Sequence, residues 1–157
     1  MNNRAIIVAS QNGYTEIVEL LVQDQRVNPS ADSKYAIQLA AQHGHTEIVK
    51  LLLRDQRVNP ADQANDAIIQ AASNGHDEAV KLLLQDQRVD PSARNNVALL
   101  AAFRKGREDI VKLLLQDKRV DPSVLNVEDI QVAVQQGRTG LVHIVQQCIR
   151  ARLQQSS

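Results

Sequence analysis

The chain has 157 residues, and its 18 basic side chains balance 18 acidic ones, so the formal net charge at pH 7 is zero. A neutral chain has no overall field that attracts nucleic acid, and two Tyr and one Phe are too few for a base-stacking surface. No apolar run reaches the length of about 18 residues that predicts a membrane helix, and no signal-peptide pattern is found. The single cysteine, Cys148, cannot form an internal disulfide, which favours a reducing compartment. We therefore expect a soluble intracellular protein that is located in the cytoplasm or else in the nucleus.

Glycine and proline recur along the chain with a fixed spacing of 31 residues. Five of the six glycines and all four prolines follow this spacing, which is typical of a repeat array rather than of a single globular core. The sequence therefore predicts one domain, residues 1–157, built from five copies of one unit. The copies comprise about residues 1–31, 32–62, 63–93, 94–124 and 125–157, and the last copy is expected to serve as a C-terminal cap.

Each copy begins with a short, alanine-rich segment. In the second copy Ile37, Ala40 and Ala41 have the i, i+3, i+4 spacing of one helical face. Gly44 is expected to end this helix, because glycine adopts the left-handed conformation without a steric penalty. The small side chains predict that neighbouring first helices approach one another closely.

A second helix is predicted to follow within two residues. Its body, Ile48 to Leu53, is apolar around most of its circumference, so one copy cannot bury it and the copies must stack. Glu47 and Lys50 have the spacing of an i, i+3 ion pair on the outer face. Pro60 then fixes a polar turn. The residues expected to cap the free amides of the second helices are Thr15, Thr46, Asp77 and Thr139.

The segment Gly44-His45-Thr46-Glu47-Ile48-Val49-Lys50-Leu51-Leu52-Leu53 gives the unit its most specific pattern, and residues 75–84 follow it closely. This unit resembles the ankyrin repeat. The resemblance implies an all-α, ankyrin-like solenoid of stacked helix-turn-helix units that serves as a non-enzymatic protein-binding scaffold. The copies are shorter than the usual ankyrin period of about 33 residues and lack its Thr-Pro-Leu-His opening. We therefore expect the projecting hairpin of the family to be shortened to a polar loop.

The sequence offers no convergent set of titratable groups for catalysis. Cys148 has no obvious His/Asn set, and His43, His45 and His76 lack further ligands, so we predict no catalytic residue, no metal site and no cofactor. A recurrent Asp-x-Arg pattern could bind an anion, but an Asp–Arg network between adjacent copies explains its constancy without a ligand. Its members are Asp24/Arg26, Asp55/Arg57, Asp86/Arg88 and Asp117/Arg119.

Differences between copies concentrate in the inter-repeat loops and at the ends of the first helices. In ankyrin proteins the matching positions line a concave groove and contact partners, although solvated positions can also simply drift. A row on the far side of the first helices, Val8, Leu39, Gln70, Ala101 and Val132, either anchors a partner or packs between helices. The candidate partner-binding residues are Gln11, Asn12, Tyr35, Gln42, His43, Asp66, Ser73, Asn74, Arg94, Arg104, Lys105 and Gln135.

The sequence thus predicts a monomeric module that binds another protein or a peptide. One alternative is a binder of an acidic segment or of nucleic acid through the basic fourth copy, which contains Arg94, Arg104, Lys105 and Arg107. Another is an engineered or consensus-like scaffold without a native partner, which the strict frame would suit. We expect that replacing Arg104 and Lys105 by Glu weakens partner binding and leaves folding intact.

Overall fold

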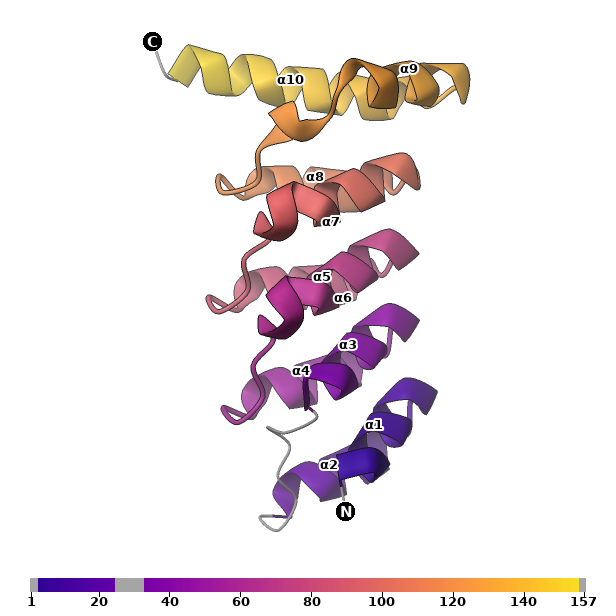
Figure 1. The fold of residues 1–157 in the computed structure, drawn as a ribbon, viewed down its shortest axis with the longest axis vertical. Coiled ribbons are helices and arrows are strands. Elements are labelled where there is room, and N and C mark those ends of the chain that lie inside the picture. Colours follow the sequence, from indigo (N-terminus) through magenta and orange to yellow (C-terminus); the bar gives the residue numbers. More distant parts are fainter. Residues whose placement is uncertain (1–2, 25–32, 156–157) are drawn as a thin grey trace.

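The computed structural model describes residues 3–24 and 33–155, and within these ranges it contains ten α-helices, one 3-10 helix and no β-strand. The α-helices form five antiparallel pairs that are stacked along one axis (Figure 1). The predicted all-α solenoid of helical repeats is therefore confirmed. The first helices of the five repeats are α1 (Asn3–Asn12), α3 (Ser33–His43), α5 (Asp62–Asn74), α7 (Ala93–Arg104) and α9 (Val127–Gln135). The second helices are α2 (Thr15–Gln23), α4 (Thr46–Arg54), α6 (Asp77–Gln85), α8 (Glu108–Gln116) and α10 (Thr139–Gln155), with the 3-10 helix η1 (Pro122–Val124) before α9.

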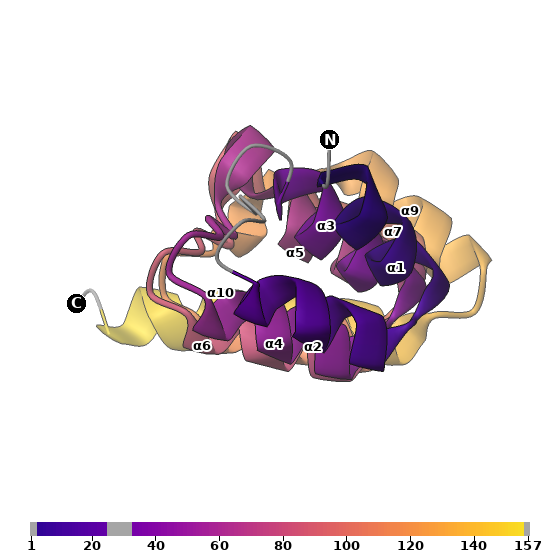
Figure 2. The same ribbon diagram turned by 90° about the horizontal axis from the view of Figure 1, so that it is seen from below.

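The helices form two rows, one of first helices and one of second helices (Figure 2). Neighbouring first helices from α1 to α7 contact one another more extensively than neighbouring second helices do. Fully buried Ala40 and Ala41 on α3 allow this close approach. The first-helix row is therefore the more tightly packed of the two rows.

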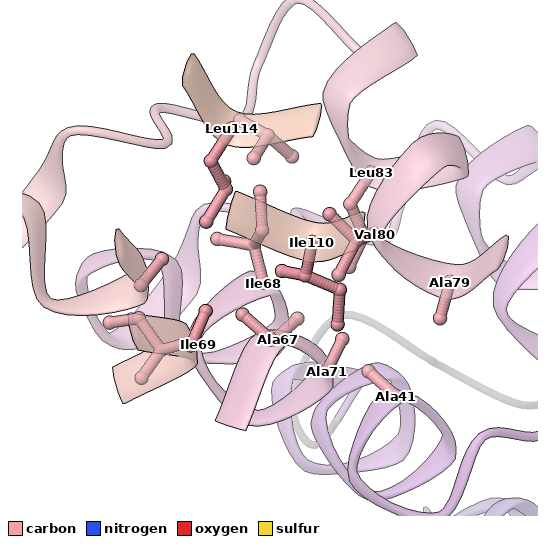
Figure 3. Close-up of a cluster of buried hydrophobic side chains, with 14 of the residues drawn as sticks. Ala41, Ala67, Ile68, Ile69, Ala71, Ala79, Val80, Leu83, Ile110 and Leu114 are labelled. Atoms are coloured by element: carbon pink, nitrogen blue, oxygen red, sulfur yellow. The ribbon is translucent and has the colours of Figure 1, made fainter. Parts of the chain in front are cut away.

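The core is continuous from repeat to repeat. Figure 3 shows Ile68 of α5 among Val80 and Leu83 of α6 and Ile110 of α8, so that two successive repeats share one cluster. Leu52 of α4 is likewise fully buried. Burial of about 1.5–3 kcal/mol per large apolar side chain is therefore available only when neighbouring repeats are in place.

In the first four repeats, the glycine that ends the first helix has two reasons to lack a side chain. Gly44 has φ +73°, in the left-handed region, as predicted for the helix end. A Cβ added there would also lie only 2.5 Å from the Nδ1 of His76, which packs over this glycine from the next repeat. The glycine spacing therefore reflects contacts between repeats as well as the local turn.

The predicted threonine caps are wrong by one residue. Helix α4 begins at Thr46, and its N-cap position is occupied by His45 without a side-chain capping bond. The Thr46 hydroxyl lies 3.3 Å from the Gly44 carbonyl, which also accepts the Thr46 amide. The hydroxyl is therefore used within the turn instead of on the helix. Thr15, Asp77 and Thr139 are likewise the first residues of their helices and not caps.

Two of the segments predicted as polar inter-repeat loops, those at the starts of α5 and α7, contain a left-handed turn. Arg94, Asn95 and Asn96 all have φ between +52° and +60°. Asparagine tolerates this conformation, and the Oδ1 of Asn96 accepts a bond of 2.8 Å from the Asp121 amide in the following turn. Asn65 binds the Asp90 amide at the same distance. These segments are therefore ordered links between repeats, and no projecting hairpin occurs in the described residues.

The Asp-x-Arg pattern is a structural network, but its Asp–Arg pairs lie within one repeat and not between repeats. The Nε of Arg88 donates to Asp86 at 2.9 Å, and this bond holds the pKa of Asp86 below its usual value. The connection between repeats comes from the same guanidinium, which donates to the carbonyls of Leu53 and Val58 at 3.0 and 2.8 Å. The prediction of an Asp–Arg bond across copies is thus corrected.

The same contact recurs along the stack. Arg57 donates to the Val22 carbonyl at 2.7 Å, and Arg119 to the Val89 carbonyl at 3.0 Å. In the last repeat α10 continues as a helix, and its Arg152 donates to the carbonyls of Leu115 and Asp117 at 2.9 and 3.2 Å. Arg26, which belongs to the predicted pattern, lies outside the described residues.

The predicted ion pairs on the second helices are confirmed. Lys50 lies 3.7 Å from Glu47, and Lys112 lies 3.0 Å from Glu108 and 3.3 Å from Asp109. All of these side chains are well exposed, so each pair contributes little to stability.

Leu52→Ala should lower the free energy of unfolding by about 2–5 kcal/mol, because it leaves a cavity in the shared core. Urea denaturation followed by circular dichroism measures the change. Leu20→Ala on α2 is the matched control: Leu20 is 68% exposed, and its truncation should cost about 0.5 kcal/mol or less. Equal losses in the two variants would contradict the assignment of Leu52 to the core.

Arg88→Ala should lower the free energy of unfolding at pH 7 by about 1–3 kcal/mol, because two carbonyls and the Asp86 carboxylate lose a charged donor. Gln87→Ala, at the exposed neighbouring position, controls for the substitution itself.

The loss in Arg88→Ala should also depend on pH. Since the folded protein holds the pKa of Asp86 low, the stabilising contribution is complete above the unfolded value of about 3.9 and disappears as pH falls through the folded value. The difference between wild type and Arg88→Ala should therefore shrink between about pH 5 and pH 2, and a constant difference would contradict the bond.

Candidate functional site

The first-helix surface consists of the exposed and half-buried side chains of α1, α3, α5, α7 and α9. The row singled out from the sequence runs along it and is partly open to solvent. Val8 and Val132 are 46% and 43% exposed, whereas Leu39, Gln70 and Ala101 are half-buried. This row therefore presents apolar surface mainly at the two ends of the stack.

In the first three repeats the last turn of the first helix carries a polar side chain that folds back on its own helix. Asn12 donates to the Val8 carbonyl at 2.8 Å, Asn74 donates to the Gln70 carbonyl at 2.9 Å, and His43 Nδ1 lies 2.9 Å from the Leu39 carbonyl. Lys105 occupies the equivalent position directly after α7 and is exposed, with no ion-pair partner among the described residues. The fourth repeat thus replaces a neutral helix end with a free cation.

The backbone carbonyls of two further candidate residues, Gln11 and Gln42, accept hydrogen bonds from the next repeat. His45 Nε2 lies 3.0 Å from the Gln11 carbonyl, and because a carbonyl only accepts, the imidazole donates. His76 makes the equivalent bond to Gln42 at 2.9 Å. These histidines therefore act in the repeat-to-repeat contact, and no group of three metal-ligating side chains occurs in the described part of the chain.

Two candidate residues in the predicted loops pair with each other. Arg94 lies 3.3 Å from Asp66, and it also donates to the Gln63 carbonyl. Asp66 is buried, so it links the third and fourth repeats and is not available on an open surface. Tyr35, by contrast, is 41% exposed in the first turn of α3. Of the remaining candidates, Ser73 is half-buried and Gln135 is exposed.

A pocket of about 290 Å³ lies between α7 and α9. Phe103, Val132 and Ala133 form its apolar lining, and Arg104 and Asp129 add a charged pair. Arg104 Nε donates to Asp129 Oδ1 at 2.7 Å, and this bond holds the pKa of Asp129 below its usual value. The Asp129 side chain is only 8% exposed, so Arg104 serves this contact as well as the surface.

Two substitutions in the repeat pattern explain why the pocket occurs at this junction. Where first helices pack closely, small residues occupy the positions that face the next and the previous repeat, as in Ala72 of α5 and Ala98 of α7. The equivalent positions at the last junction are Phe103 and Asp129, which are larger, and α9 does not pack closely on α7. Figure 1 shows α9 displaced toward the C-terminal end of α7.

Sequence reasoning did not place Phe103, Asp129 or Ala133 in the candidate site. A signal was nevertheless present in the sequence, because Phe103 replaces Ala41 and Ala72 of the second and third copies and Asp129 replaces Ala98 of the fourth. Asn126 adds to the site by capping α9, since its side chain accepts the Asp129 amide at 2.9 Å while Asp129 binds the Asn126 amide. Asp129 is therefore fixed from its own helix as well as by Arg104.

A family model for ankyrin repeats, in three copies, matches residues 1–64 and 55–129. The chain belongs to the ankyrin-repeat family. A search of curated proteins gave no match. Ankyrin repeats generally serve as protein-protein interaction modules and are typically non-enzymatic. In the described part of this ankyrin protein, none of the helices is both long and apolar enough to cross a membrane.

The ion pair alters one expectation from the sequence, namely that Arg104 and Lys105 can both become Glu without loss of stability. Arg104→Glu places a carboxylate beside partly buried Asp129 and should lower the free energy of unfolding by roughly 1–3 kcal/mol. Lys105→Glu should leave it within about 0.5 kcal/mol of wild type. Thermal and urea denaturation of the two single variants measure the difference, and equal stabilities would contradict a structural role for Arg104.

Proposed function

We propose that this ankyrin-repeat chain is a non-enzymatic interaction scaffold that binds a protein or peptide along its first-helix surface. One observation carries the proposal: equivalent exposed positions present different side chains in successive repeats, as in Asn12, His43, Asn74 and Lys105. Constant residues such as Arg88 are engaged in contacts that hold the stack together. The variable side chains, three of which bond only to a carbonyl of their own helix, therefore stay exposed to a partner.

The repeat framework suits such binding because it is preorganised. Carbonyls at the ends of both helix rows are bonded to the following repeat, as Gln42 is to His76 and Leu53 is to Arg88. A surface that is already ordered loses little conformational entropy on association. The exposed variable positions lie in the last turns of rigid helices, which positions them more accurately than a flexible loop would.

A second candidate function is the recognition of an acidic segment. Lys105 and Arg107 are exposed and have no carboxylate partner in the described residues, because nearby Glu108 and Asp109 pair with Lys112. Positive charge thus gathers at the ends of the first helices in the last two repeats, despite the neutral total charge. Nucleic acid would respond to the same charge, but few aromatic side chains are available for stacking.

We further propose that the chain acts as a single monomeric domain, residues 1–157, in the cytoplasm. Its only cysteine, Cys148, is half-buried with its sulfur 4.0 Å from the Leu115 carbonyl. A thiol in this position has no cysteine to pair with inside the chain, which suits a reducing compartment. The proposal calls for no cofactor.

The combined substitution His43→Ala and Lys105→Glu should abolish binding of the native partner, since both side chains lie on the first-helix surface. The double variant should still fold. Crosslinking capture from source cells, quantified by mass spectrometry against wild-type bait, is the measurement. Lys81→Glu on α6 is the control, because Lys81 is a similarly exposed cation on the second-helix side. Loss of the same partners with Lys81→Glu, or retention with the double variant, would contradict the proposed surface.

A further inference from the structure

We propose that the pocket between α7 and α9 receives one large apolar side chain from an acidic segment of the partner. The inference rests on the proposed function and specifies the partner chemistry at one place on the first-helix surface. It comes from an opening that the repeat pattern itself does not predict.

The lining of the pocket suits an apolar side chain. Phe103 and Ala133 are buried, and Val132, which lines the opening, is 43% exposed. The volume of about 290 Å³ is at the lower end of ligand pockets, which favours a single side chain over a cofactor. Removing a Leu- or Phe-sized group from water here would contribute about 1.5–3 kcal/mol.

The charge around the pocket identifies the kind of segment that carries this side chain. Arg104 is neutralised by Asp129, but Lys105 and Arg107 have no carboxylate partner in the described residues. Arg138 lies at the same ends of the first helices, where it donates to the Arg104 carbonyl at 2.8 Å and packs over Gly106. Lys105 and Arg138 therefore stand at the C-terminal end of α7, while the Arg107 guanidinium packs over Gly75 at the end of α5, one repeat earlier.

The acidic side of the pocket makes this attraction directional. Glu128 lies in the first turn of α9 and also lines the pocket, so it repels a carboxylate from that end. The acidic residues of the partner should therefore lie against the C-terminal end of α7. The apolar side chain in the pocket would then lie between these residues and Glu128. Earlier repeats have neutral Gln42 and Ser73 where the fourth has Arg104, so this charge pattern belongs to the last junction.

Two grooves among the second helices do not offer the same chemistry. The opening between α2 and α4 lies among second helices and is lined by Asp55 and Arg57, which already bind each other at 2.6 Å. The opening between α4 and α6 likewise includes Asp86, the partner of Arg88. An occupant there would have to compete with the bonds that hold the stack.

The test uses the full chain and a phage-displayed library of random 12-residue peptides. Peptides selected on wild type should carry one Leu, Ile, Met or Phe beside two or more acidic residues. Val132→Gln should weaken these peptides about tenfold by making the pocket polar without changing charge. Val134→Gln is the matched control, because Val134 is 51% exposed on the same helix but does not line the pocket. Lys105→Glu should also weaken binding and reduce its salt dependence.

The outcomes separate this inference from the proposed function. Peptides that bind Val132→Gln as tightly as wild type but no longer bind His43→Ala would overturn the proposed role of the pocket. The same result would still support binding along the first-helix surface. Enrichment of basic or uncharged peptides, equal loss in the two valine variants, or no enrichment at all would each overturn the inference. Competition by single-stranded DNA without any need for an apolar residue would assign the charge to a polyanion, and this too overturns it. The urea midpoints of all variants verify that they are folded.

Discussion

Most repeats have backbone carbonyls at the ends of their helices that accept bonds from side chains of the following repeat. At the end of a first helix the donor is the residue after the next glycine, as in the bond from His76 to Gln42. At the end of a second helix the donor is the next arginine, as in the bond from Arg88 to Leu53. The last carbonyls of a helix have no partner within it, so these side chains cap one repeat from the next. One repeat therefore depends on the next for these hydrogen bonds, and the shared apolar core holds the same repeats together.

The period alone was sufficient to predict the helix pairs, the glycine turns and the need for stacking, because each follows from a residue type at a fixed position. It could not distinguish a contact within a repeat from one between repeats. Asp86 and Arg88 recur together in every such turn, and a shift of 31 residues makes both arrangements look the same in the sequence. The prediction of threonine caps failed for a local reason, because the Thr46 hydroxyl is bonded to the turn before the helix.

The candidate site was harder to predict, because side chains vary between repeats for two different reasons. Some, such as Asn74 and Lys105, vary at exposed positions. Others vary because they compensate for each other across one junction: Asp66 and Arg94 form an ion pair, although both were expected to contact a partner. Arg104 and Asp129 are a second such pair across one junction. A single sequence separates these two kinds of variation only when the positions that face each other are known.

The open junction also raises the question of what holds the fifth repeat in place. Helix α9 packs weakly on α7, so attachment depends on α10, which contacts α8 and runs for 17 residues. Arg152 near its end donates to the carbonyls of Leu115 and Asp117 in the fourth repeat. Extension of α10 thus places the capping arginine on a helix instead of in a turn. Because the second-helix row secures the repeat, the first-helix row can leave a pocket at this junction without loss of the terminal repeat.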